Sequence, residues 1–539
     1  MAVLLLACLL PAAQVTGLIM AATLAYYIIC YLISPLKDIP GPFLAKFTNL
    51  WRVYDYYHLR SPDTQKKLHA KHGTAVRLGP NLVSLNDPSL IPIIYNTRGT
   101  FRKGDFYSAS DALVHGNRME HIFSTRSNQF HLEQLTPVQK FYSNQGVLAY
   151  ENLIDRAMLL LCEQLEIRFA NGANAGKTCD IADWISYFSW DLMSQITWSS
   201  EMGFMKTGSD IKNMIYIGEL SMMYLGLVGQ IPWIAKLLST NPYRPRTVDA
   251  FDHVVHFSFA RLMERITALK SPAFPDAVDP EKSGIGIKKD YIYSFLEAKH
   301  LYPDLITDDN IVMYILTNLE ANSSHISAGA DPIATVQKAI IYHLLRNPSV
   351  LDKLRAELDA ANLTFPVRFE EVHISSKLPY LEAVIKEGLR IHPTVGLCLE
   401  RVVPDPGFTL PDGRFIPAGR IVGVNPSVMT LDHNVYGPDA HIFRPERWLQ
   451  RYSENVEGYA DRLRKMEELN TFVWGGGNRT CLGRFLATTS LYKITATLFS
   501  RYDLSLEDPT REWELRRHWM VYNDKIKVKV ARRNMCIKD

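Results

Sequence analysis

The stretch WGGGNRTCLG, residues 474–483, places one cysteine, Cys481, behind a run of glycines and before an apolar sequence with helical spacing. Glycine-rich loops that precede helices often bind phosphate, but this loop fits neither common phosphate pattern. No GK[ST] sequence follows, and Thr480 stands where the third glycine of a GxGxxG motif starting at Gly475 would be. The arginine that a cysteine phosphatase needs six residues after its thiol is replaced by Ala487. Phosphate chemistry is therefore a poor fit.

A metal-bound thiolate suits the same residues better. Cys481 would begin a helix, where free backbone N–H groups and the positive end of the helix dipole favour an anionic sulfur. No second cysteine or histidine lies nearby, which disfavours zinc and iron–sulfur clusters and favours haem b, a cofactor that brings its own equatorial ligands. Arg479 would then be a natural partner for a haem propionate. A structural cysteine in a glycine turn is the alternative.

The amino-acid composition limits which macromolecules the protein binds and in which cellular compartment it folds. The 539-residue chain is 47% hydrophobic with a formal net charge of +3, so it is globular and has no general excess of positive charge for nucleic acid. Its seven cysteines are scattered and contain no CxxC pair, which argues against a disulfide framework. We therefore expect a reducing compartment.

The N-terminal sequence predicts a membrane anchor. Residues 1–34 contain no charged side chain, and about 20 apolar residues suffice to cross a bilayer core. A cleavable signal peptide is the alternative. Residues 35–45 contain three prolines and predict a stiff hinge. Because Lys37, Lys46 and Arg52 follow the apolar segment, the positive-inside rule places the catalytic domain, residues 46–539, in the cytosol.

The elements that must position the cysteine are mostly helices. Apolar residues recur at helical spacing along most of the chain, and we found no internal repeat. Hairpins are predicted at residues 75–87 and 407–419, around Gly-Pro-Asn and Pro-Asp-Gly turns, and a strand is predicted near residues 526–530. We therefore expect one mainly α domain with small β-sheets.

The cysteine loop resembles that of the cytochrome P450 family, through Trp474, Gly477, Arg479, Cys481 and Gly483. Tryptophan stands where phenylalanine is usual. Two further motifs match in order and spacing. Glu387 and Arg390 lie in YLEAVIKEGLRIHP, and Arg447 lies in HIFRPERW. In the resembled family these three residues form a buried triad, and Arg401 in LCLERVVP would be a second propionate contact.

The resemblance implies the cytochrome P450 fold, with Cys481 as the axial ligand of haem iron. It also implies electrons from an NADPH-cytochrome P450 reductase, a lipophilic small-molecule substrate, and an endoplasmic reticulum membrane location. Arg484 and Lys493 are candidates for receiving the acidic surface of the reductase, although ordinary solvated charges are at least as common. The sequence is most similar to filamentous-fungal members of the pisatin demethylase group, which act in secondary metabolism.

The distal-helix signature, Ala-Gly-x-Asp/Glu-Thr in the family, is only partly present. Ala328, Gly329 and Asp331 match, but Pro332 stands in place of the threonine whose hydroxyl helps to deliver protons. Proline would kink the helix and free the carbonyl of Ala328. His325 could act on substrate, and a histidine packed at the pocket edge is the alternative.

The sequence also offers hydroxyl groups in place of the threonine, from Ser324, Ser327 or Thr335. A second departure concerns the family's His-x-x-x-Arg motif, where His131 fits but Leu135 replaces the arginine, so that one propionate contact is lost unless another base substitutes.

Three functions follow from these residues. The first is a membrane-anchored monooxygenase. The second is a haem-thiolate enzyme that inserts no oxygen, such as an isomerase, a dehydratase, a desaturase or a coupling oxidase. The third is a haem protein without turnover.

Overall fold

The computed structural model describes residues 12–114, 117–234, 252–269, 289–319, 329–374 and 377–533. The predicted mainly helical architecture is confirmed. The longer helices are α2 (Ala12–Leu32), α8 (Glu151–Leu165), α9 (Ile181–Trp198), α11 (Met214–Val228), α13 (Asp252–Leu269), α14 (Tyr291–Leu301), α15 (Asp308–Leu319), α16 (Ala330–Arg346), α17 (Pro348–Ala361), α18 (Pro379–Ile391), α21 (Val456–Thr471) and α22 (Arg484–Arg501). The shorter ones are α3 (Leu50–Tyr57), α4 (Ser61–His72), α5 (Ile91–Ile94), α6 (Asn128–Leu135), α7 (Asn144–Leu148), α10 (Phe204–Thr207), α19 (Pro426–Met429) and α20 (His433–Tyr436).

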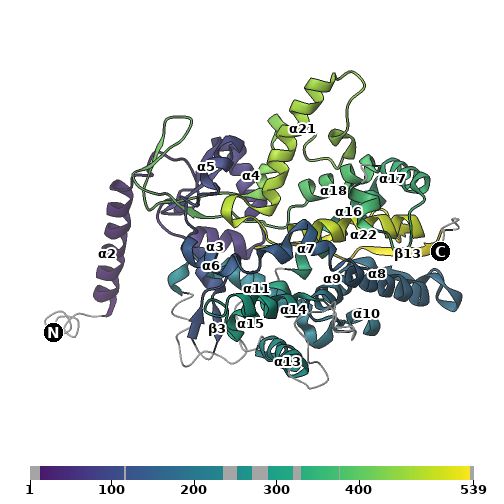
Figure 1. Ribbon diagram of the computed structural model, residues 1–539. Helices are drawn as coiled ribbons and strands as arrows, with labels where there is room; N and C mark the ends of the chain where they lie inside the picture. Colours follow the sequence, from purple (N-terminus) through teal and green to yellow (C-terminus); the bar gives the residue numbers. More distant parts are fainter. Residues whose placement is uncertain are drawn as a thin grey trace.

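Three helices form the centre of the core. Nearly every residue of α9 and α22 is buried, and α16 packs against both of them. A helix that is apolar around most of its circumference is stable only when other elements cover it. In Figure 1 α16 and α22 cross the middle of the molecule, with α8 and α9 beneath them. Because α22 directly follows the cysteine loop, this packing fixes the loop to the core.

Small sheets lie around the helical core. The largest contains β1 (Ala75–Arg77), β2 (Leu82–Leu85), β9 (Ile421–Val424) and β6 (Arg401–Val402), in that order. A second joins β10 (Tyr502–Leu506), β13 (Lys527–Arg532) and β5 (Thr178–Asp180). Hairpins pair β3 (Ala112–Val114) with β4 (Asn117–Met119), β7 (Gly407–Thr409) with β8 (Phe415–Pro417), and β11 (Glu514–Arg517) with β12 (Val521–Asp524).

The predicted hairpins at residues 75–87 and 407–419 are confirmed by antiparallel pairing of β1 with β2 and of β7 with β8. The strand predicted near residues 526–530 corresponds to β13, whose Val528 and Val530 are buried. Alternation of buried and exposed side chains was the signal that identified this strand.

The segment predicted as a hinge lies against the first sheet. The Arg77 N–H donates to the Pro40 carbonyl at 2.7 Å, and its guanidinium donates to the Leu36 carbonyl at 3.1 Å. A Cβ at Gly41 would lie 2.2 Å from the Arg77 carbonyl oxygen, so only glycine fits this close approach. The hinge is therefore attached to β1 rather than being a free spacer.

The N-terminal helix α2 stands apart from the rest of the molecule in Figure 1. Across the ranges that the structure describes, no helix meets the length and hydropathy expected of a membrane span. The anchor over residues 1–34 stays a prediction.

Candidate haem-binding site

The cysteine loop is held by backbone contacts that require glycine. Gly477 has φ +63°, and a Cβ there would lie 2.3 Å from the Asn96 carbonyl oxygen. The Cys481 N–H donates to the Trp474 carbonyl at 2.7 Å, which closes the loop before α22 begins at Arg484. The half-buried ring of Trp474 packs against the main hydrophobic core. The loop is thus a rigid support for the thiol.

The Cys481 thiol is exposed, yet the protein around it raises its pKa by desolvation. An accessible but desolvated sulfur lies in a recess rather than on a convex surface. The Gly483 N–H and the charge of Arg484 lower the pKa, as expected at a helix N-terminus, but burial outweighs them. A metal cation at the sulfur would therefore be needed to hold it as a thiolate at neutral pH. A Cβ at Gly483 would meet no protein atom within 4 Å, so the loop leaves space beside the sulfur.

A cluster of cations lies next to the loop, with Lys103 and Arg401 buried and Arg479 half-buried. Burial and, to a smaller extent, the charge of Arg401 lower the pKa of Arg479 to about 10. The Arg479 guanidinium donates to the Ser127 carbonyl at 3.0 Å and to Asn128 Oδ1 at 3.1 Å, at the start of α6. That helix carries His131, whose pKa burial and the charges of Arg479 and Lys103 lower to about 3, so this ring is neutral. The structure thus brings Arg479, Arg401 and His131 together.

Lys103 belongs to this cluster, and the sequence analysis missed it. Its ammonium contacts the rings of both Tyr107 and Phe123, with Nζ 4.2 Å from each ring centroid. Burial lowers the pKa of Lys103 well below its usual value, and the charges of Arg401 and Arg479 lower it further. The ammonium donates to the Phe123 carbonyl at 2.5 Å, which leaves two of its N–H groups for another acceptor.

These cations fit the carboxylates of haem. Among the residues described, Lys103, Arg401 and Arg479 form no ion pair with any carboxylate, and Arg479 Nε is buried without a hydrogen-bond partner. Buried cations without anions are costly, and the two propionates of haem would neutralise them beside an accessible thiol. In the family's His-x-x-x-Arg motif the arginine is replaced here by half-buried Leu135. Lys103 can take the place of that arginine, because it adds another base to the same cluster.

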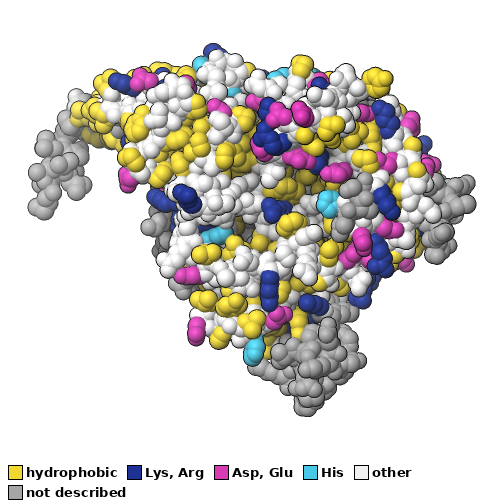
Figure 2. All heavy atoms as spheres, turned by 45° about the horizontal axis from the view of Figure 1, so that its top comes forward, with side chains coloured by type: hydrophobic (Ala, Val, Ile, Leu, Met, Phe, Trp, Pro, Cys, Tyr) yellow, Lys and Arg dark blue, Asp and Glu magenta, His cyan; other side chains and the backbone are white. Residues whose placement is uncertain are grey.

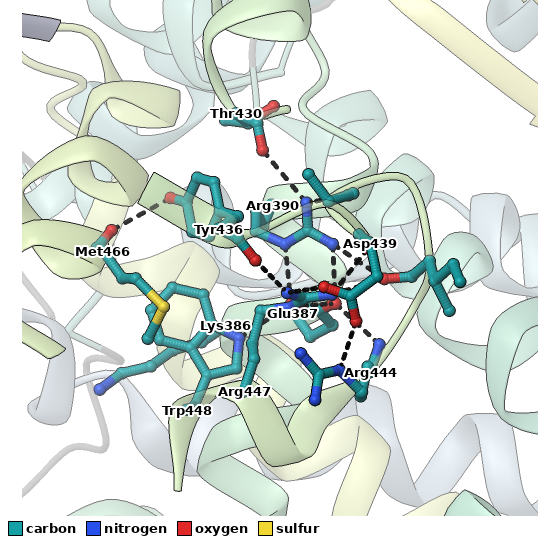
Figure 3. Close-up of polar contacts among 12 residues, drawn as sticks. Lys386, Glu387, Arg390, Thr430, Tyr436, Asp439, Arg444, Arg447, Trp448 and Met466 are labelled. Carbon is teal, nitrogen blue, oxygen red and sulfur yellow. Dashed lines mark hydrogen bonds and ion pairs between the residues drawn. The ribbon is translucent and has the colours of Figure 1, made fainter. Parts of the chain in front are cut away.

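Glu387, Arg390 and Arg447 are fully buried and joined, as Figure 3 shows. Glu387 Oε1 lies 2.7 Å from Arg390 Nη2 and 2.9 Å from Arg447 Nε. The indole N–H of Trp448 donates to Glu387 Oε2 at 2.9 Å, and the Arg444 backbone N–H donates to Oε1 at 2.8 Å. One carboxylate thus ties α18 to the segment that follows α20 and precedes the cysteine loop.

Pro332 does not lie in the interior of a helix, as the expected kink requires. The helix α16 starts at Ala330, so Pro332 lies in its first turn, where a proline removes no intrahelical hydrogen bond. Ala328 and His325 lie outside the described residues. Gly329 is required by a close approach, because a Cβ there would lie 1.9 Å from the Asn318 carbonyl oxygen of α15. Thr335 is buried.

Asp331 is buried and hydrogen-bonded on both of its oxygens. The Trp190 indole N–H donates to Oδ1 at 3.1 Å, and the Tyr522 hydroxyl donates to Oδ2 at 3.0 Å. These donors come from α9 and β12, which are distant in sequence.

The expectation that Lys493 meets a reductase was wrong. Its ammonium is buried and forms ion pairs with Glu151 and, at 2.7 Å, with Asp155. Burial on α22 removes the Lys493 ammonium from water, and the two carboxylates of α8 compensate for that loss of hydration. Arg484 is half-buried, with its guanidinium 4.6 Å from the Phe485 ring centroid.

Comparison with known proteins agrees with this site. Residues 40–530 match the sequence model described as Cytochrome P450. The chain is 34% identical to cytochrome P450 monooxygenase cfoH of Aspergillus candidus, over 97% of this chain and 93% of that protein. It is 33% identical to cytochrome P450 monooxygenase cicH of Emericella nidulans, over 93% of this chain and 94% of that protein. The chain therefore belongs to the cytochrome P450 family, whose oxidoreductases bind haem iron through an axial cysteine thiolate.

Proposed function

We propose that the protein is a membrane-anchored monooxygenase that oxidises a lipophilic small molecule with O₂ and electrons from an NADPH-cytochrome P450 reductase. The observation that carries the proposal is the accessible Cys481 thiol beside a cluster of cations that, within the described part of the chain, form no ion pair with a carboxylate. Haem bound here would supply the redox chemistry of oxygen activation. The fungal monooxygenases to which the chain is similar support a role in secondary metabolite biosynthesis.

The residues divide into three roles under this proposal. Cys481 would hold the iron, and the glycines around it leave space beside the sulfur. The propionates would be bound by Arg479, Arg401, Lys103 and His131, with His131 as a neutral donor. The triad of Glu387, Arg390 and Arg447 fixes the segment leading to the cysteine loop.

Membrane attachment is supported by exposed apolar side chains. Residues of α2 such as Ile19 and Leu24 are exposed, and so are Phe43, Leu44 and Tyr57 farther along. Figure 2 shows hydrophobic side chains covering α2 and the neighbouring surface at the upper left. Exposed apolar surface of this extent marks contact with lipid or another protein. We propose the endoplasmic reticulum membrane, with the catalytic domain in the cytosol.

A haem-thiolate enzyme without oxygen insertion is the second candidate, because Pro332 provides no hydroxyl at the threonine position. The two candidates differ in the fate of oxygen. The intermediate that accumulates when this gene is deleted would be given to the enzyme and its reductase under ¹⁸O₂. Label in the product supports the monooxygenase, and an unlabelled product supports the second candidate.

The ligand assignment has its own test. Cys481→Ser should abolish the thiolate-type carbon monoxide difference spectrum of the reduced protein. If that spectrum survives, Cys481 is not the axial ligand.

A further inference from the structure

The helix α11 carries a single charged residue. Its sequence, MIYIGELSMMYLGLV, is otherwise apolar or uncharged, and the charge is that of Glu219. A helix that is apolar around its circumference gives its neighbours no polar pattern that fixes its rotation, so the partner of its one charge matters. An ion pair can specify one arrangement of a helix even where it adds little to net stability.

Glu219 begins a chain of four alternating charges. Its carboxylate forms an ion pair with Arg516 of β11, with Oε2 2.8 Å from Nη2. The Arg516 guanidinium also pairs with Asp524 of β12. The other oxygen of Asp524 lies 2.7 Å from Nζ of Lys338, which is buried on α16. A continuous series of contacts thus joins α11 to α16 through the β11–β12 hairpin.

Two further groups face this chain. His518 Nε2 lies 3.7 Å from Glu219, and a carboxylate oxygen of Glu514 lies 3.6 Å from Arg516. Burial lowers the pKa of His518, so its ring is neutral at neutral pH and competes little with Arg516 for the carboxylate. Lys338 is buried and the other three members are partly exposed. Removing one member leaves its neighbour desolvated and short of a partner, which costs more than losing an exposed pair.

The apolar side of α11 borders the haem site. Met222 and Leu225 are fully buried in a cluster that also contains Tyr107. The Tyr107 hydroxyl lies 3.5 Å from Arg401 Nη1, and its ring contacts the Lys103 ammonium. A displacement of α11 would therefore loosen the packing beside the cation cluster that fits the haem propionates.

We propose that Glu219 and Arg516 are positioning residues that hold α11 against the haem site, and that the chain reaching Lys338 couples α11 to α16. They act through α11 rather than on reacting atoms. A lipophilic ligand bound at the haem leaves when α11 moves, so the chain sets its dissociation rate. This role goes beyond the proposed function, because retention of a ligand does not depend on the fate of oxygen.

The probe is phenylimidazole, whose ring nitrogen binds ferric haem iron and shifts the Soret band. Glu219→Gln should raise its dissociation rate about fivefold, because loss of one partly buried ion pair shifts an equilibrium by roughly that factor. Cyanide is small enough to leave without movement of α11, so its dissociation rate should not change. Lys140→Met is the matched control, because it removes an exposed ion pair, with Glu297 at 2.7 Å, that involves neither α11 nor α16.

Two further measurements separate positioning from general destabilisation. Amide exchange across α11 in the haem-loaded protein should be faster in Glu219→Gln and in Arg516→Met, and unchanged in Lys140→Met. Lys338→Met, at the far end of the chain, should also raise phenylimidazole dissociation. Substitutions without shared contacts normally have additive effects. Glu219→Gln combined with Lys338→Met should therefore have a less than additive effect, because both interrupt one chain.

The outcomes that would overturn the two parts of the proposal are distinct. Unchanged phenylimidazole dissociation in both Glu219→Gln and Arg516→Met would overturn the positioning role, and Arg516→Met alone decides it if Glu219→Gln does not fold. Additive effects of Glu219→Gln and Lys338→Met would overturn the coupling to α16. Because phenylimidazole binding needs no O₂, an unlabelled product under ¹⁸O₂ would overturn the proposed function instead.

Discussion

Lys103 offers the sharpest test of the haem site, because its replacement should change cofactor binding and stability in opposite directions. In Lys103→Met the thioether keeps the contact with Tyr107 and Phe123 but removes the charge. Loss of one hydrogen bond to a charged group costs ~1.5–3 kcal/mol. The haem dissociation constant should therefore rise roughly 10- to 150-fold.

The haem-free protein should become more stable. The folded chain holds the pKa of Lys103 well below its usual value, so the ammonium costs folding free energy at every pH below the pKa of ~10.4 in the unfolded chain. Removing the charge removes that cost, and the free energy of unfolding of the haem-free protein should increase. Leu135 lies one helical turn after His131 on α6, so Leu135→Arg added to Lys103→Met should recover haem affinity.

The assay measures haem transfer to apomyoglobin by Soret absorbance, and urea unfolding of the haem-free protein. Lys177→Met is the matched control, because Lys177 is exposed and its Nζ donates only to Asn174 at 2.6 Å. Unchanged haem transfer in Lys103→Met would refute the propionate contact. A less stable haem-free variant would refute the argument that this charge lacks an anionic partner.

Three further outcomes are expected. Glu387→Gln should lower the free energy of unfolding by ~3–5 kcal/mol, measured in urea, because it leaves two buried arginines without their negative partner. The control Glu382→Gln, at a partly exposed position of α18, should lower it by less than ~1 kcal/mol. Burial lowers the pKa of His392 to about 3, so this residue should contribute ~2 kcal/mol to the loss of stability as pH drops from 6.5 to 5, where only the unfolded chain gains its proton. In urea titrations of His392→Gln the loss should be smaller by that amount, while other buried histidines such as His131 still contribute. Gly329→Ala should destabilise the start of α16 by ~1–3 kcal/mol, seen as faster amide exchange there, because the new methyl meets a carbonyl; unchanged exchange would contradict that clash.

The parts of the site that sequence could predict are those in which neighbours in the chain set the chemistry. The loop around Cys481 and the Glu387–Arg390 spacing are local, because a turn or a single helix face fixes them. Lys103 and Tyr522 carry no such signal, since each meets the site only through tertiary packing. Pro332 was misjudged because the rule for helix interiors was applied to a residue that lies in a first turn.

The attachment of residues 35–45 to Arg77 has a mechanical consequence. Arg77 lies on β1, at one edge of the sheet, and Arg401 lies on β6, at the other edge. A force on the N-terminal helix is therefore transmitted through the four strands of this sheet to Arg401, the residue proposed to contact a propionate. A truncation that removes the N-terminal helix should end before Ser34, whose hydroxyl accepts from Arg77 at 2.9 Å, because cutting inside the hinge would remove contacts of β1 and loosen the sheet that carries Arg401.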